Sequence, residues 1–527
     1  MTLNSRFICI HGHFYQPPRE NPWLEEIEVQ ESAFPYHDWN ERVHAECYAP
    51  NASPRALNGE GKVIDTADNY SRMSFNFGPT LLSWMERHAP ETYAAVLEAD
   101  RQSRKNFGGH GSAIAQAYNH IIMPLADLRD KRTQIVWGIR DFERRFRRQP
   151  EGMWLAETAV DLETLDLLAE SGIRFTILAP VQARRVRRIG ETKWTDVSEG
   201  RIDPKQSYAC ILPSGRKIGL FFYNGPIAHD IAFGDLLNDG ESFARRLLGA
   251  FEDSPVTQLS HVATDGETFG HHHRFGDMAL AFALHSLQTR GLARLTVYGE
   301  HLAASLPSYE VEIVENSSWS CVHGVERWRN DCDCSTGRHP GWHQRWRAPL
   351  REALDRLRDR VVILYQSRAG ALLRDPWAAR DDYISVILDR SRAAIDGFLA
   401  RHAAKGLDMD EKALALKLLE MQRNALLMFT SCGWFFDDIS GIETRQILLY
   451  AARAMQLAGE AGEASLEDDF LRLLRRAPSN IPELGDGARV YEIFVRPTVL
   501  AMLRATSGIP FEAAFCVDDL RNATQKK

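Results

Sequence analysis

The sequence predicts an α/β fold, a parallel barrel, followed by an all-helical carboxyl-terminal domain. Up to about residue 300, apolar runs of strand length alternate with amphipathic helical stretches. Beyond about residue 345, long segments with a 3.6-residue period replace the strand pattern. Polar and acidic residues gather directly after several strands, as they do at the carboxyl ends of the strands in parallel barrels. This last observation favours a barrel over a doubly wound sheet.

Six apolar runs are the predicted strands of the first domain. They cover residues 6–10, 153–155, 174–178, 217–223, 259–263 and 292–297. Amphipathic stretches at 161–171, closed by Gly172, and at 278–287 predict helices between them. The expected domains are a catalytic barrel over residues 1–310, a connecting segment rich in Cys and Trp over 311–345, and a helical domain over 346–527.

The helical domain contains one segment that is a candidate for function. Apolar residues between Met409 and Met428 recur at steps of three and four, which predicts a helix with one buried face. A second helix is expected at about 444–457, followed by a connection at 457–465. The intervening residues 431–441 are rich in aromatic and acidic residues and include Trp434. Because loops often carry function, Trp434 is a candidate substrate contact, and the alternative is a structural anchor between helices.

Composition limits the classes of partner and the cellular location. A chain of 527 residues predicts two or three domains. Its 63 basic and 71 acidic residues give a net charge of −8, so nucleic acid is not an expected partner. No apolar stretch reaches the roughly 18 to 20 residues of a membrane helix, and the eight cysteines lack the spacing of a disulfide scaffold. We therefore expect no membrane partner, reduced thiols and a cytoplasmic location, while the oligomeric state stays open.

Two acidic segments about a hundred residues apart could supply a catalytic pair. Glu157 follows the predicted strand 153–155, and Asp265 follows the strand 259–263. Two carboxylates at a sugar-binding cleft can cleave a glycosidic bond, one as nucleophile and the other as general acid and base. Trp154 is of a type that stacks on sugar rings, and Glu267 and His271 could bind hydroxyl groups. From spacing alone, a glutamate after a strand also serves as a helix cap or an ion-pair partner.

His11 and His13 follow the first predicted strand and allow three interpretations. A His-x-His pair on extended chain points both rings to the same side. With Asp265 as a further ligand, the pair could hold the metal ion of a hydrolase. The two rings could equally contact a sugar or be histidines of the core.

Four motifs, in this order, resemble glycoside hydrolase family 57. They are H-G-H-F-Y-Q-P-P at 11–18, G-H-G-S-A-I-A-Q-A-Y-N-H at 109–120, W-L-A-E at 154–157 and D-G-E-T-F-G at 265–270. The resemblance covers about residues 6–330, and the carboxyl-terminal third resembles a domain of unknown function attached to one branch of the family. It implies a seven-stranded (β/α) barrel followed by a helical region, and an enzyme that acts on α-glucans with retention, without a catalytic metal or other cofactor.

The same resemblance implies roles for individual residues. Glu157 would be the nucleophile and Asp265 the general acid/base. The residues expected to line the sugar site through the first two motifs are His11, His13, Gln116, Tyr118 and His120. The chain departs from the family pattern where Phe14 and Tyr15 separate His13 from Gln16, and where Ala156 stands in place of a common proline. These departures leave hydrolysis, transfer and branching open.

The expected function is therefore that of a retaining glycoside hydrolase or glucanotransferase acting on an α-glucan or oligosaccharide. One alternative is a metal-dependent hydrolase, such as a polysaccharide deacetylase or phosphoesterase, with His11, His13 and Asp265 as ligands. Another is a glycan-binding protein that retains the cleft without turnover.

A separate group of Cys and His residues lies in the connecting segment. Cys321 and His323 are followed by Cys332 and Cys334, a C-x-H and C-x-C arrangement within a short stretch. Four such side chains could bind zinc, although paired C-x-x-C motifs are more diagnostic. Reduced thiols in a folded loop are the alternative.

Overall fold

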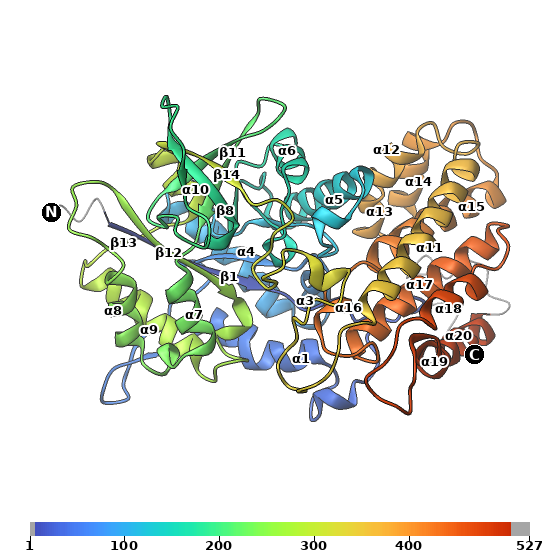
Figure 1. The fold of residues 1–527 in the computed structure, drawn as a ribbon, viewed down its shortest axis with the longest axis horizontal. Helices are drawn as coiled ribbons and strands as arrows, with labels where there is room; N and C mark the ends of the chain where they lie inside the picture. Colours follow the sequence, from blue (N-terminus) through green and yellow to red (C-terminus); the bar gives the residue numbers. More distant parts are fainter. Residues whose placement is uncertain (1–5, 507–527) are drawn as a thin grey trace. The chain divides into compact units, whose positions relative to one another are not determined.

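The computed structural model describes residues 6–506, which form two compact units (Figure 1). The first unit comprises the chain up to Gln16, Glu28–Tyr118 and Phe142–Val322. The second comprises Pro17–Ile27, Asn119–Asp141 and the chain from His323 onward. The first unit is α/β and the second is helical, so the predicted fold class is confirmed.

The long strand β1 (Arg6–Phe14) is the centre of the first unit. It pairs in parallel with β12 (Gln258–Asp265), β4 (Ser74–Phe77) and β13 (Arg294–Leu295), and Figure 1 shows β1 beside β12. All residues of β1 after Arg6 are buried. A strand that is buried on both faces reads as a nearly continuous apolar run, which explains why its first half was easy to predict.

Four further parallel strands continue from β4. They are β5 (Ala115–Gln116), β6 (Met153–Trp154), β7 (Phe175–Leu178) and β11 (Lys217–Phe222). Parallel bridges join Phe75 to Ala113 and Gly152 to Phe175, so the pairing passes from β4 to β7. After β11, the Asn224 N–H donates to the His261 carbonyl of β12 at 2.9 Å. The pairings described within residues 6–506 include no strand ladder between β11 and β12, and closure of a seven-stranded barrel stays a prediction.

Four strands that the sequence did not predict widen the β7–β11 sheet. They are β8 (Ala183–Arg188), β9 (Thr195–Asp196), β10 (Ser207–Ile211) and β14 (Tyr309–Ile313). The strand β8 reads Ala-Arg-Arg-Val-Arg-Arg and lacks an apolar run. Cross-strand ion pairs stabilise it instead, because Arg185 and Arg187 contact Glu312 and Glu310 of β14 at 2.7 and 2.6 Å.

The helices of the first unit connect its strands. They are α1 (Trp39–Val43), α2 (Ala49–Ala52), α3 (Pro79–His88), α4 (Pro90–Asn106), α6 (Leu162–Glu170), α7 (Gly225–Phe233), α8 (Gly240–Leu248), α9 (Gly276–Thr289) and α10 (Tyr298–Ala304). A short hairpin, β2 (Ala56–Leu57) with β3 (Val63–Asp65), completes the described elements. The predicted helices at 161–171 and 278–287 are confirmed as α6 and α9. Asp161 begins α6 by accepting a hydrogen bond from the Thr164 N–H.

Three strand predictions had wrong boundaries. The strand predicted at 259–263 extends to Asp265, so this residue ends β12 rather than following it. The strand predicted at 6–10 continues to Phe14, so His11 and His13 lie within β1 rather than beyond it. The strand predicted at 292–297 is reduced to the two residues of β13. The prediction ended β1 at Ile10 because the polar residues His11 and His13 interrupt the apolar pattern, although both are buried.

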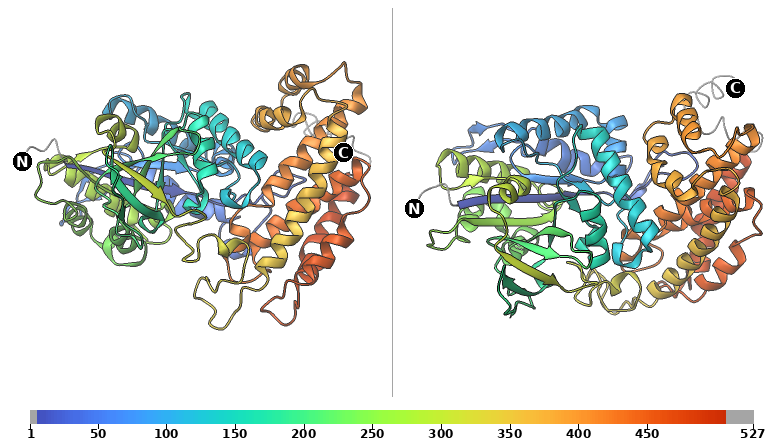
Figure 2. Two further views of the ribbon diagram at one scale, coloured as in Figure 1. Left: turned by 45° about the horizontal axis from the view of Figure 1, so that its top comes forward. Right: turned by 90° about the horizontal axis from the view of Figure 1, so that it is seen from above.

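The second unit consists of helices, as predicted. They are α11 (Arg347–Ala369), α12 (Pro376–Asp382), α13 (Ile384–Ile387), α14 (Arg392–His402), α15 (Met409–Leu427), α16 (Cys432–Phe435), α17 (Ile442–Glu460), α18 (Glu467–Leu474), α19 (Gly487–Val490) and α20 (Arg496–Thr506). The long helices α11, α15 and α17 pack side by side (Figure 2). Leu418, Met421 and Ala425 of α15 are buried, as their spacing predicted. The helix predicted at 444–457 extends to Glu460. None of the helices within residues 6–506 is both long and apolar enough to cross a membrane.

Two segments from the amino-terminal half belong to the second unit, and no pattern in the sequence marks them. One of these segments contains the part of helix α5 (Leu128–Phe146) up to Asp141. Asp130 of α5 forms a buried ion pair with Arg380 of α12 at 2.8 Å. In the same contact, the Trp137 indole N–H donates to the Arg380 carbonyl at 3.1 Å.

We expect Arg380→Ala to destabilise the protein by about 3–5 kcal/mol, because it leaves the buried Asp130 carboxylate without its ion-pair partner. The matched control is Arg401→Ala, which breaks a pair with Asp382 whose side chains are 53% and 37% exposed and which should cost less than about 1 kcal/mol. Urea unfolding followed by circular dichroism measures both variants. Equal shifts of the transition in the two variants would contradict a stabilising role for the buried pair.

Candidate active site

The two predicted catalytic carboxylates stand at the carboxyl ends of parallel strands in the first unit. Glu157 follows β6 within a short 3-10 turn, Ala156–Thr158. Asp265 is the last residue of β12 and pairs in register with His13 of β1. Because parallel strands present their carboxyl ends at one edge, these residues share that edge with the first motif.

The backbone at Glu157 adopts a conformation that is rare for residues with a side chain. Glu157 has φ 56° and ψ 21°, and Thr158 follows with φ 52°. Two successive non-glycine residues in the left-handed region each cost of order 1 kcal/mol or more, and such strain concentrates at functional sites. Hydrogen bonds hold the turn, since the Trp319 N–H donates to the Glu157 carbonyl at 3.0 Å and the Thr158 hydroxyl donates to Gln182 at 2.8 Å.

Two donors from one loop hold the Glu157 carboxylate. The Trp319 indole N–H lies 2.9 Å from Oε2, and the Ser320 hydroxyl lies 2.7 Å from the same oxygen. An indole N–H can only donate, so Oε2 accepts, as an ionised carboxylate does. Sequence reasoning missed this role of both residues. No spacing in the sequence relates Trp319 or Ser320 to Glu157.

Asp265 is poised to hold a proton near neutral pH. Solvent reaches its side chain, while the protein around the carboxyl group removes much of its hydration. This burial, together with repulsion from the Glu157 carboxylate, raises the pKa of Asp265 to about 7. Glu157 is the second cause of the raised pKa, after burial. A general acid needs such a pKa, and a nucleophile needs the opposite.

A third acidic residue, Glu267, lies two positions after Asp265 in the sequence. It is buried and accepts hydrogen bonds from the Tyr48 hydroxyl at 2.6 Å and the Tyr15 N–H at 2.8 Å. Burial is the main cause that raises the pKa of Glu267 to about 8, and Asp265 adds to it. Gly266 stands between the two acids, and a Cβ there would lie 2.3 Å from the Phe14 ring. The turn therefore requires glycine at this position.

His11 and His13 form a buried layer with Trp154. Both imidazole rings stack on the Trp154 indole, with ring centroids 5.0 and 4.8 Å apart. Asn76 contacts a ring nitrogen of each histidine, and its amide donates to Gln116 Oε1 at 2.8 Å. Burial lowers the pKa of His11 to about 3, so its ring is neutral. Trp154 is fully buried and supports the histidines rather than offering a face to solvent.

The hydrogen bonds of His11 and His13 bear on whether the pair binds a metal ion. The nitrogens of His11 lie 3.0 Å from the Ser74 hydroxyl and 3.1 Å from Asn76 Oδ1, which are hydrogen-bond partners. The side-chain amide of Asn76 also lies within hydrogen-bond distance of His13 Nδ1. Both ring nitrogens of His11 and Nδ1 of His13 therefore have hydrogen-bond partners within the protein. This arrangement fits histidines held in a rigid polar layer.

The other predicted contacts lie in several places. Tyr118 is buried in the first unit, and His271 contacts the carboxylate of Glu46 there. His120 belongs to the second unit, where it is buried with its Nδ1 2.7 Å from the Ser431 hydroxyl. Trp434 is fully buried in the second unit and donates to the Arg347 carbonyl. Its burial favours the structural alternative for the 431–441 segment.

We expect Glu157→Gln to lower the pKa of Asp265, because the substitution removes the negative charge that raises it. Infrared difference spectroscopy of the carboxyl band, compared with an Asp265→Asn spectrum, measures this titration. Glu163→Gln, which changes an exposed glutamate on α6, is the control and should leave it near pH 7. An unchanged titration in Glu157→Gln would show that the two carboxyl groups are electrostatically independent.

Solved structures of three other proteins resemble most of the chain. An exo-type maltose-forming amylase from Pyrococcus sp. ST04 has 15% identity and a TM-score of 0.68, with 97% of this chain and 95% of that chain covered. A family 57 branching enzyme from Thermococcus kodakaraensis has 16% identity and a TM-score of 0.52, with 94% and 96% covered. A 4-alpha-glucanotransferase from Thermococcus litoralis has 14% identity and a TM-score of 0.50, with 86% and 60% covered. At these identities the likeness establishes the fold.

Family models match both parts of the chain. A search of curated proteins gives no match. Residues 342–516 match a domain of unknown function, DUF3536. Residues 11–313, more than half of the chain, match the model described as glycosyl hydrolase family 57. The chain therefore belongs to glycosyl hydrolase family 57.

Proposed function

We propose that the protein is a retaining enzyme acting on α-linked glucans, with Glu157 as nucleophile and Asp265 as general acid and base. The observation that carries the proposal is the opposite environment of the two carboxyl groups. Glu157 accepts two hydrogen bonds suited to an ionised carboxylate, and Asp265 has a pKa of about 7. Membership of the family and the activities named for the three similar structures support an α-glucan as substrate.

The first step forms a covalent intermediate. A carboxylate oxygen of Glu157 attacks the anomeric carbon while the bond from that carbon to the glycosidic oxygen breaks. Asp265 gives its proton to the departing oxygen, which leaves as a hydroxyl group of the leaving sugar. The electron pair of the broken bond thus ends on a neutral alcohol, and Asp265 becomes ionised. Trp319 and Ser320 keep the Glu157 carboxylate oriented during the attack.

The second step regenerates the enzyme. Ionised Asp265 removes a proton from the acceptor, whose oxygen attacks the anomeric carbon and displaces Glu157. Water as acceptor gives hydrolysis, and a sugar hydroxyl gives transfer or branching. Two displacements restore the original anomeric configuration. Retention requires the two carboxyl groups to stand about 5–5.5 Å apart, against about 6.5–9.5 Å for inversion.

Azide rescue of two variants separates the roles of the two carboxyl groups. With an aryl α-maltoside, Glu157→Ala plus azide should give the β-glycosyl azide, because azide takes the place of the missing nucleophile. Asp265→Ala plus azide should give the α-glycosyl azide, because azide then displaces Glu157 from the intermediate. Nuclear magnetic resonance of the product determines the configuration. The α product from the Glu157 variant would contradict its role as nucleophile.

The pH profile tests the acid role of Asp265. A carboxyl group with a pKa of about 7 is protonated below pH 7 and loses its proton above it, so kcat/KM should fall as the pH rises through about 7. In Asp265→Asn we expect activity on maltooligosaccharides to drop about 10²–10⁴-fold and this basic limb to disappear. Glu163→Gln should keep both the activity and the limb. A limb that persists unchanged in Asp265→Asn would assign the titration to another group.

Product analysis separates the proposal from its alternatives. Maltooligosaccharides incubated with the protein should give shorter chains on hydrolysis, and longer or branched chains on transfer, with neither in Glu157→Gln. Binding without any product would indicate a glycan-binding protein. Turnover that survives Glu157→Gln and is lost with a chelator would indicate the metal-dependent hydrolase.

A further inference from the structure

We propose that residues 321–334 bind a zinc ion through Cys321, His323, Cys332 and Cys334. One potential ligand atom from each side chain lies within 4.8 Å of all the others. Three thiolates and an imidazole are a common set of ligands for a structural zinc ion, and soft sulfur ligands favour zinc over magnesium or calcium. The group takes no part in the proposed reaction, so the proposal is independent of the catalytic mechanism.

The distance between one sulfur and the imidazole nitrogen matches tetrahedral coordination. Zinc–sulfur bonds of about 2.3 Å and zinc–nitrogen bonds of about 2.0–2.1 Å place a sulfur and a nitrogen ligand about 3.6 Å apart, and two sulfur ligands about 3.8 Å apart. Cys334 Sγ lies 3.6 Å from His323 Nδ1. Cys321 is two residues before His323 in the sequence, so the chain itself keeps its thiol within reach of the same ion.

The backbone between two of the ligands is shaped to bring their side chains together. Asp333 separates Cys332 from Cys334 and has φ 60°. This left-handed conformation is uncommon outside glycine, although Asp tolerates it better than most residues. The resulting turn lets two thiols that are neighbours in the sequence approach one ion.

A buried arginine of the second unit provides a complementary charge. Three thiolates, a neutral imidazole and Zn²⁺ carry a net charge of −1. The Arg347 guanidinium lies 4.0 Å from Cys332 Sγ and donates to the Cys334 carbonyl at 2.8 Å. Arg347 is fully buried, and its charge therefore acts on the thiols with little screening by water.

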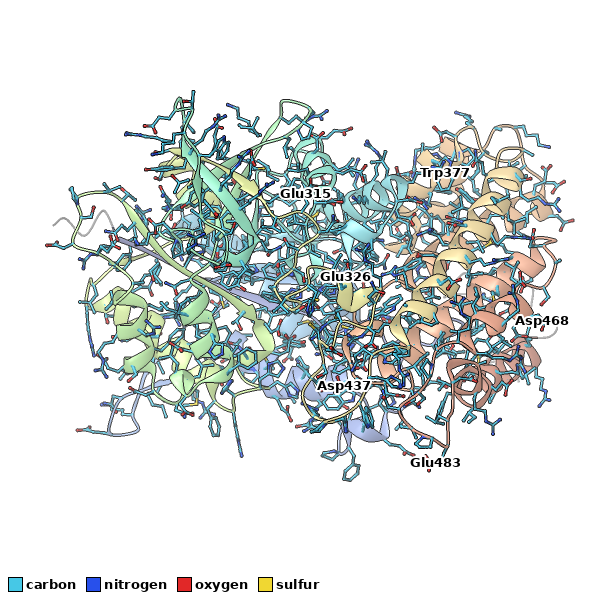
Figure 3. The ribbon with its side chains drawn as sticks, viewed as in Figure 1. Glu315, Glu326, Trp377, Asp437, Asp468 and Glu483 are labelled. Carbon is cyan, nitrogen blue, oxygen red and sulfur yellow. The ribbon has the colours of Figure 1, made fainter. Side chains whose placement is uncertain are left out.

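The residues around the group are fixed to the helical unit. Asp437 accepts hydrogen bonds from both the backbone N–H and the hydroxyl of Thr336, two residues beyond Cys334. Arg327, which lies in the turn Glu326–Trp328, donates to the Ser335 and Phe435 carbonyls. Figure 3 labels Glu326 and Asp437, the landmarks of this turn and of the 431–441 segment. A preorganised backbone lowers the entropy lost when the ion binds.

The position of the group suggests what the ion stabilises. Cys321 directly follows Trp319 and Ser320, the two donors to Glu157. A zinc ion at Cys321 would restrict the end of the loop that orients the nucleophile. The ion is thus expected to order this loop rather than to contact substrate.

Metal analysis of the full-length protein, purified under reducing conditions, tests the proposal. We expect an equimolar amount of zinc by mass spectrometry, retained on gel filtration. The double variant Cys332→Ser/Cys334→Ser should lose it, and the control Cys432→Ser, which removes a thiol elsewhere in the second unit, should keep it. Cobalt substitution should give thiolate charge-transfer bands and the absorption of a tetrahedral ion, both absent in the double variant.

Hydrogen exchange gives a second measurement that does not depend on catalysis. Removal of zinc should speed amide exchange in residues 317–336, and zinc restored to the protein should reverse it. Circular dichroism of the double variant shows whether its loss of metal reflects unfolding. The zinc content of the single variant His323→Ala, which changes an exposed side chain, is measured as the second test. Protein that is free of metal and takes up neither zinc nor cobalt stoichiometrically would overturn the proposal. Equal loss of metal in Cys432→Ser, or iron in place of zinc, would overturn it as well.

Discussion

The proton affinity of Asp265, raised by burial and by the nearby Glu157 carboxylate, is the constraint around which the candidate active site is arranged. Glu157 and Asp265 come from strands that are far apart in the sequence, and the charge of one raises the pKa of the other. The protein favours a single negative charge by giving Glu157 two hydrogen-bond donors and by removing water from Asp265. The difference between these environments assigns the two chemical roles, since two carboxyl groups in identical surroundings would titrate alike.

The surrounding residues keep this asymmetry in place. A buried layer of His11, His13 and Trp154 lies within the core, and Asn76 joins both histidines to Gln116. A protonated His11 would lower the pKa of Asp265 and leave that carboxyl group without its proton at neutral pH, so the low pKa of buried His11 serves the site. The strained backbone at Glu157 is stabilised by the hydrogen bonds that its carbonyl and the Thr158 hydroxyl make with the surrounding protein.

The sequence predicted the fold class and the positions of the two carboxylates, for identifiable physical reasons. Buried parallel strands are continuous apolar runs, and acidic residues directly after them are conspicuous. Strand β8 escaped prediction because arginines, paired with glutamates on β14, occupy most of its positions. Trp319 and Ser320 escaped as partners of Glu157 because their contact depends on tertiary structure alone. Trp434 was predicted from its loop composition as a possible substrate contact, but its indole is fully buried, and local composition does not distinguish an anchor from an exposed contact.

The discontinuous composition of the second unit has a consequence for folding during synthesis. Residues 119–141 leave the ribosome long before Arg380, which pairs with Asp130. The Arg380 carbonyl, which accepts the hydrogen bond of the Trp137 indole, is synthesised equally late. During that interval the segment exposes apolar surface and an unpaired acid. The nascent first unit therefore carries a region that cannot reach its final packing, and contacts of such large sequence separation slow folding.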